Sequence, residues 1–289
     1  MGLAWQQGPL AEGSLGTFLS PTPLPERLLF AEPLRRRMRV NFADTWIVDS
    51  EDVVLLHEPG RYPVAYFPQS DIVPGVLVPS ETVTEHRDLG PTAWYSVSVG
   101  DTGKARSAWR HTALPEYAKV LEERVAFAWR GMDAFYEEEE RIVGHAADLY
   151  HRNDIRCTSR HLVVKAGDRV VADTRAPLAL YESGFAPRWY VPREDVSAQL
   201  LAAVSRQTFC PYKGLCDYYD IGDATRAAWS YRDAYREVDR IDDLISFEPG
   251  KVTVTIYGAR LEPAPGQQVV PHGPDRGLTP EEAVAPAMP

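Results

Sequence analysis

Short apolar runs separated by Gly, Pro and Asp follow one another along most of the chain. In the second half, Leu162-Val-Val-Lys and Arg169-Val-Val-Ala-Asp flank an Ala-Gly-Asp turn, which is the pattern of a β-hairpin. The segment 38–49 repeats this pattern around Ala43-Asp44. Further runs rich in Val, Tyr and Trp predict strands at 178–181, 188–191, 217–221, 225–231 and 251–257. The chain is therefore predicted to be mainly β, with antiparallel sheets and few short helices.

One short helix is predicted in each copy, and in the second copy it directly follows Pro192. Asp195 is placed to cap it, and apolar residues then recur at helical spacing. These residues are Val196, Leu200, Leu201 and Val204.

The two halves of the chain are copies of one unit. Placing Glu58 against Glu182 gives an offset of 182 − 58 = 124 residues, and the same offset pairs many other identical residues. These pairs include Asp49/Asp173, Gly60/Gly184, Pro63/Pro187, Tyr66/Tyr190, Pro68/Pro192, Thr84/Thr208, Gly90/Gly214 and Tyr95/Tyr219. After a four-residue deletion the offset becomes 120 and pairs Trp109 with Trp229 and Phe127 with Phe247. A period this long indicates duplicated domains and not a solenoid.

The composition changes at the ends of the two copies. We expect an N-terminal arm at 1–36, a first β domain at 37–144, a linker at 145–160, a second β domain at 161–260 and a disordered Pro-rich tail at 261–289.

The chain is acidic, with a formal net charge of −10, which repels nucleic-acid backbones and anionic membrane surfaces. No apolar stretch approaches the roughly 18 to 20 residues that span a bilayer. We therefore expect a cytoplasmic protein that binds neither nucleic acid nor membranes, and homo-oligomerisation stays open. Three cysteines, Cys157, Cys210 and Cys216, form no Cys-x-x-Cys pair, so disulfides and a thiolate zinc site are not expected.

A block in the second copy carries a family resemblance. Thr208-x-Cys210-Pro-Tyr-Lys-Gly214 is followed by a Tyr-Tyr pair and by Ala228-Trp-Ser-Tyr231. Together with Tyr190-Val-Pro-Arg-Glu-Asp195 and Ser159-Arg-His161, this block resembles the two-copy members of the family called domain of unknown function 427, which is also labelled a nucleotidyltransferase family. The resemblance covers about residues 37–258 and implies small all-β domains with tent-like sheets.

The first copy departs from this motif. His86-Arg-Asp-Leu-Gly90 stands where the second copy has Cys210-Pro-Tyr-Lys-Gly214, so the turn glycine remains while Cys, Tyr and Lys are lost. We therefore interpret the first copy as degenerate and expect a site in the second copy alone.

The candidate catalytic residues are Glu182, Cys210 and Lys213. A lysine close to a cysteine favours the thiolate, and Lys213 could instead bind an anion or form a covalent bond. A carboxylate among apolar neighbours either pairs with a base or serves general acid–base catalysis. The structural alternative is a turn shaped by Pro211 and Gly214, with Cys210 in the core and Glu182 in a supporting role.

The candidate ligand-binding residues are aromatic or basic. An aromatic set could line a pocket for a planar ligand, although aromatics at strand spacing also build cores. His161 is a candidate base for Cys210. The aromatic set comprises Tyr190, Tyr218, Tyr219 and Trp229. The residues predicted to bind the ligand are Tyr190, Tyr212, Tyr219, Trp229 and His161.

No metal or cofactor is predicted. His145, Asp148 and His151 share a face only if their segment is helical, and Gly144 argues against a helix. The chain has no phosphate-binding glycine loop and no Asp-x-Asp after a Gly-Ser turn, so nucleotidyl transfer is disfavoured. The sequence favours a protein that binds a small molecule in its second copy, with an enzymatic and a non-catalytic interaction role both open.

Overall fold

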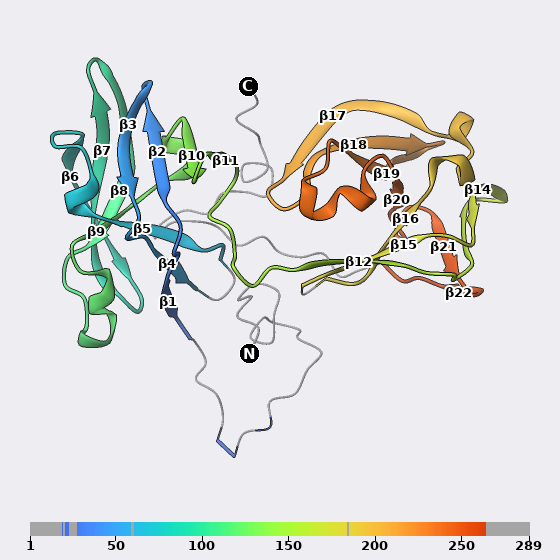
Figure 1. Cartoon of the computed structure of the whole chain (residues 1–289), viewed down its shortest axis with the longest axis horizontal. Helices are drawn as coiled ribbons and strands as arrows, with labels where there is room; N and C mark the ends of the chain where they lie inside the picture. Colours follow the sequence, from blue (N-terminus) through green and yellow to red (C-terminus); the bar gives the residue numbers. More distant parts are fainter. Residues whose placement is uncertain (1–18, 20, 23–27, 59–60, 184, 264–289) are drawn as a thin grey trace. The chain divides into compact units, whose positions relative to one another are not determined.

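The computed structural model describes residues 19, 21–22, 28–58, 61–183 and 185–263. Contacts divide the chain into two units between Asp148 and Leu149. Among these residues, each unit contains one seven-stranded and one four-stranded antiparallel sheet. Figure 1 shows the course of the strands in each unit. The predicted fold class, two tandem antiparallel β domains, is confirmed.

The first domain has a long sheet and a short sheet. In spatial order the long sheet consists of β1 (Phe30–Pro33), β4 (Val54–His57), β5 (Val64–Pro68), β9 (Arg124–Phe127), β8 (Thr102–His111), β7 (Gly90–Val99) and β6 (Leu77–His86). The short sheet consists of β11 (Glu140–Ile142), β10 (Ala134–Glu137), β2 (Met38–Phe42) and β3 (Thr45–Ser50).

The second domain repeats this arrangement strand for strand. Its long sheet consists of β12 (Asn153–Cys157), β15 (Leu178–Glu182), β16 (Arg188–Val191), β20 (Ile245–Phe247), β19 (Ala224–Arg232), β18 (Gly214–Ile221) and β17 (Ala202–Cys210). Its short sheet consists of β14 (Arg169–Thr174), β13 (Leu162–Ala166), β21 (Thr253–Ile256) and β22 (Ala259–Arg260).

The strand register matches between the domains. Three adjacent strands place one residue each in a row across the middle of the long sheet. Paired residues of antiparallel strands lie on the same face of a sheet, so each row shares one face. The row reads Tyr66, Ala126 and Trp109 in the first domain and Tyr190, Ser246 and Trp229 in the second.

Helical structure consists of short 3-10 segments among the described residues. They are η1 (Gln69–Asp71), η2 (Glu116–Leu121), η3 (Trp129–Gly131), η4 (Arg193–Asp195), η5 (Ala198–Leu200) and η6 (Arg236–Ile241). No helix in these parts of the chain is long and apolar enough to cross a membrane.

The helix predicted after Pro192 does not form, so that prediction is wrong. Val196 is drawn into a β-bridge with Ala172, and the neighbouring Ser197 N–H donates to the Val171 carbonyl at 2.8 Å. Val204, expected on the helix, lies in β17 opposite Tyr218. Two single 3-10 turns, η4 and η5, stand where the helix was expected, because sheet pairing on both sides overrides the local periodicity.

Both domains begin earlier than the composition suggested. β1 lies within the expected arm and β12 within the expected linker, and they pair with β4 and β15 as edge strands of the long sheets. Half-exposed edge strands carry weak hydrophobic alternation, which explains why the pattern did not mark them. The predicted disordered tail lies outside the described residues from position 264 onward.

The two faces of each long sheet pack differently. In the second domain, one face packs on the short sheet around Val164, Trp189 and Phe247. The opposite face carries a separate cluster that includes Tyr190, Tyr231, and Val238 and Ile241 of η6. This second face, the η6 face, positions the candidate site.

Candidate functional site

The β17–β18 hairpin turn delivers Lys213 to the η6 face. Cys210 ends β17 opposite Gly214, and the Lys213 N–H donates to the Cys210 carbonyl at 3.2 Å across the turn. Gly214 has a φ of +95°, a conformation that residues with a Cβ rarely adopt. The turn glycine is therefore required by the backbone, while Lys213 is free to serve the site.

Lys213 forms a buried ion pair with Glu182. Only 6% of Lys213 is exposed, and its Nζ lies 2.5 Å from Glu182 Oε1. His151 Nε2 lies 3.0 Å from the same oxygen. The Glu182 carboxylate therefore contacts both an ammonium and an imidazole, which offset the cost of burying its charge.

The contacts fix the charge states of the pair. Burial alone would raise the pKa of Glu182, but the hydrogen bond to His151 and the charge of Lys213 lower it to about 2. Burial alone would lower the pKa of Lys213, but Cys210 and Glu182 hold it above its usual value. At neutral pH, Glu182 is a carboxylate and Lys213 an ammonium, so Lys213 is a fixed cation and not an amine nucleophile.

Cys210 and Tyr212 complete the cluster. Cys210 is half-buried and lies close enough to Lys213 to contribute to the raised pKa of that lysine. The Tyr212 ring stacks on His151 with a centroid distance of 3.7 Å and an interplanar angle of 11°. The structure therefore brings four of the predicted site residues, Glu182, Cys210, Lys213 and Tyr212, together around His151, which the sequence analysis considered only as a metal ligand.

Aromatic side chains form the rest of the η6 face. The Trp229 Nε1–H points at the Tyr190 hydroxyl from 3.5 Å, and Tyr218 hydrogen-bonds Thr208 through its hydroxyl at 2.8 Å. Tyr190 is fully buried, whereas Trp229 and Tyr218 are only partly buried. Burial raises the pKa of Tyr190 and holds its hydroxyl neutral.

The first domain places a different network at the same positions. His86 occupies the place of Cys210, and its Nε2 lies 3.0 Å from Glu58 Oε2. The backbone N–H groups of Asp88 and Leu89 both donate to His86 Nδ1, at 3.2 and 3.1 Å. Nδ1 is therefore an acceptor, and Nε2 carries the proton that His86 donates to Glu58.

His111 closes this network behind His86. Its Nε2 lies 3.0 Å from the Tyr66 hydroxyl, and its Nδ1 lies 2.9 Å from Thr92 Oγ1. Trp109 Nε1–H donates to the Tyr66 hydroxyl at 3.3 Å. Burial, with a smaller effect of His86, lowers the pKa of His111 to about 4, so this ring is neutral at neutral pH.

A comparison with known protein families shows which family the chain belongs to. The sequence model of the domain of unknown function DUF427 matches residues 30–138 and again residues 154–258. The chain belongs to this family. It is a tandem two-copy DUF427 protein, which confirms the resemblance drawn from the Cys210–Gly214 block. No curated protein matches the chain.

Two predicted site residues lie away from the cluster around Glu182 and Lys213. Tyr219 packs with the core on the opposite face of the long sheet, where its hydroxyl accepts a hydrogen bond from Arg193 at 3.0 Å. His161 lies beside the short sheet with its Nε2 2.6 Å from Asp173 Oδ1. His161 is therefore not the base for Cys210, and that pairing is corrected: His151 is the histidine of the cluster.

The three residues considered as metal ligands, His145, Asp148 and His151, are divided between the two domains. His145 stacks on Tyr62 of the first domain at 3.7 Å, whereas His151 contacts Glu182 of the second. Across the described residues, no group of three or more His, Cys, Asp and Glu side chains is arranged to hold a metal ion.

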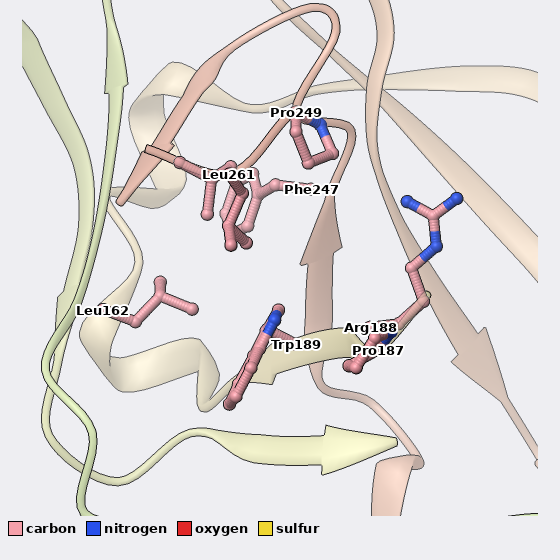
Figure 2. A pocket seen from close by; sticks show the side chains of 8 residues that line it. Leu162, Pro187, Arg188, Trp189, Phe247, Pro249 and Leu261 are labelled. Atoms are coloured by element: carbon pink, nitrogen blue, oxygen red, sulfur yellow. The ribbon is translucent and has the colours of Figure 1, made fainter. Parts of the chain in front are cut away.

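A small apolar pocket lies between the two sheets of the second domain (Figure 2). Its volume of about 20 Å³ accommodates about one water molecule. Trp189 and Leu162 face this pocket, and none of the predicted site residues lines it. It is a packing gap between the sheets, and Arg188, whose guanidinium lies beside Trp229, is among the residues that line it.

The sequence interpretation did not place three residues that the structure puts beside this cluster or on the η6 face. His151 was considered only as a metal ligand, and Arg188 and Ser246 were not considered at all. The internal repeat carried a usable signal for two of them, because Arg188 aligns with Val64 at offset 124 and Ser246 with Ala126 at offset 120. Polar residues that replace apolar ones at equivalent core positions mark the copy that differs in chemistry.

Proposed function

We propose that the second domain binds a small molecule on its η6 face and that Cys210 is the reactive group there. Lys213 supplies a fixed positive charge, Glu182 and His151 position it, and Trp229 and Tyr218 contact the ligand. In a catalytic cycle, the Cys210 thiol exchanges a proton with the ligand or adds across a polarised C=O bond of it: the S–C bond forms, the C–O π bond breaks, and the thiol proton passes to the oxygen. The ammonium stabilises the negative charge that develops during that step. We expect the protein to act in the cytoplasm.

The observation that carries the proposal is the buried Lys213–Glu182 pair. Taking two charges out of water costs several kcal/mol for each ion, and apolar replacement of such a pair is often neutral or stabilising. The first domain has made half of this replacement, with the fully buried Leu89 at the position of Lys213. A charge kept in one copy at a cost in stability supports a functional role in that copy.

Solvent exposure of the side chains also supports a binding site in the second domain. Cys210, Tyr218 and Trp229 of the second domain are all partly exposed. Their counterparts in the first domain are all buried. These counterparts are His86, Trp94 and Trp109.

A thermal-shift screen against metabolites tests the proposal. A ligand that binds the native state raises the apparent melting temperature by mass action. The screen is run on the native chain, on Lys213→Met and on Cys210→Ala. Lys165→Met, which removes an exposed lysine of the short sheet, is the matched control.

We expect at least one ligand whose shift disappears in Lys213→Met and persists in Lys165→Met. If that ligand is turned over and Cys210→Ala binds without turnover, the function is enzymatic. Ligands that shift all variants equally would place the binding site elsewhere and favour the interaction role.

A further inference from the structure

The η6 face of the second domain is rich in hydrogen-bond donors where the first domain is apolar. Three positions differ in this way, and each pair is equivalent by strand register or hairpin position. The pairs are Arg188/Val64, Ser246/Ala126 and Lys213/Leu89. Val64, Ala126 and Leu89 all belong to the apolar core cluster of the first domain.

Ser246 is the least expected of these residues. It is 1% exposed, and its Oγ has no hydrogen-bond partner within the described parts of the chain. It lies between Tyr190 and Trp229 in the central row of the face. A buried hydroxyl without a partner costs roughly 1–3 kcal/mol, which an acceptor atom above it would recover.

Arg188 lies on the same face, beside the indole of Trp229. Its Cζ is 5.4 Å from the ring centroid, a cation–π arrangement. Its only ion pair within the described residues is a long one, with Arg188 Nη1 3.5 Å from Glu248 Oε2, and the two side chains are 25% and 29% exposed. A pair this long and this exposed contributes little, so most guanidinium donors remain available to a ligand.

The donors and the rings select one chemical class. Trp229 and Tyr218 offer partly exposed aromatic faces, which favour a flat ring. Arg188, Ser246 and Lys213 offer N–H and O–H donors, which favour acceptor oxygens, and a guanidinium recognises an acid group through two parallel bonds.

We infer that the ligand of the second domain is a small planar ring that carries an acidic group. The ring lies against Trp229, and the acid is bound by Arg188 with Ser246 beneath. This inference rests on the proposed function, because it specifies the ligand of the same face.

Three probes separate the ring from the acid: benzoate, the uncharged benzamide and the non-planar cyclohexanecarboxylate. Each is titrated into the full chain while the indole N–H resonance of Trp229 is followed by NMR. Trp229→Phe assigns that resonance among the seven tryptophans. The variants Arg188→Val and Ser246→Ala introduce the residues of the first domain, and Arg169→Val removes an exposed arginine of the short sheet as the control.

We expect benzoate to bind tighter than cyclohexanecarboxylate both in the native chain and in Arg188→Val, because only benzoate has a flat ring to lie against Trp229. We expect benzoate to bind about tenfold tighter than benzamide, as one charge-assisted hydrogen bond predicts. This preference should fall to about onefold in Arg188→Val, fall partly in Ser246→Ala and persist in Arg169→Val. The other indole resonances report whether each variant is folded.

Two results would overturn the inference, and they differ in meaning. If benzamide binds as tightly as benzoate at Trp229, the acid is not recognised while binding on the η6 face stands. If no probe moves the Trp229 resonance and all shifts occur at other tryptophans, the proposed binding face itself fails.

Discussion

His86 in the first domain and Cys210 in the second occupy the same place in the fold. Each ends the strand before the hairpin turn, and each pairs with the turn glycine, Gly90 or Gly214. His86 donates a hydrogen bond to Glu58, whereas in the second domain Lys213 and His151 contact the equivalent Glu182. The two domains thus satisfy the same carboxylate in different ways. Glu58 contacts His86 and forms an ion pair with Arg61 at 3.6 Å, whereas Glu182 forms its ion pair with Lys213 beside a thiol.

Introducing the first domain's histidine should partly restore the stability that the second domain loses when Lys213 is replaced. Lys213→Leu alone removes one partner of a buried ion pair and should lower the free energy of unfolding of the second domain by about 3–5 kcal/mol. Adding Cys210→His supplies the donor that His86 provides to Glu58 and should recover about 1–3 kcal/mol. Urea unfolding of both variants measures the difference. Failure of the double variant to recover stability would show that the two carboxylate sites are not equivalent.

His151 should stabilise Glu182 through its hydrogen bond and Tyr212 through its stack. His151→Phe keeps an aromatic ring on Tyr212 and loses the bond, so we expect a loss of roughly 1–3 kcal/mol. His151→Ala loses both contacts and should cost more. Chemical denaturation compares them with His161→Phe, whose partly exposed ring should matter less than about 0.5 kcal/mol. Equal effects of the three variants would contradict this role.

His111 should make the first domain less stable in mild acid. Its pKa is lowered to about 4 by burial, so below about pH 6.5 the unfolded chain takes up a proton that the folded chain refuses. The resulting loss grows between pH 6.5 and pH 4 to about 3 kcal/mol and then levels off. His111→Gln removes this contribution, so the native protein should lose more stability than the variant across that range. Parallel pH dependences in urea unfolding would contradict the buried neutral state.

The three thiols should differ in reactivity. Cys157 is exposed, Cys210 is half-buried and Cys216 is buried. Burial also raises the pKa of Cys216 to about 12, so its thiolate is scarce at neutral pH. Alkylation followed by peptide mass spectrometry should modify Cys216 last, and only on unfolding. Early modification of Cys216 in the folded chain would contradict the packing of the η6 face.

Much of the fold followed from the sequence because the repeat and the strand periodicity are local or directly comparable features. The offset of 124 residues correctly paired Tyr66 with Tyr190 and Glu58 with Glu182. The helix after Pro192 failed because pairing of Val196 and Val204 with distant strands outweighs their spacing.

The site was only partly predictable. Lys213, Cys210 and Glu182 stood out as ionisable or reactive groups in apolar surroundings. His151 could not be assigned, since its contact with Glu182 depends on how β12 pairs with β15. Tyr219 was misplaced relative to Tyr218 because adjacent strand residues point to opposite faces, and a sequence does not say which face holds the site.

The central claim is that the Lys213 ammonium stabilises the negative charge that develops when the Cys210 thiol reacts. The rate at which iodoacetamide alkylates Cys210 at pH 7 tests this claim most directly. The measurement uses a Cys157→Ser background, which removes the exposed thiol. We predict that Lys213→Met slows the reaction about tenfold or more, while Lys213→Arg, which keeps the charge, stays within about threefold of the parent. An unchanged rate in Lys213→Met, with the fold intact, would contradict the account.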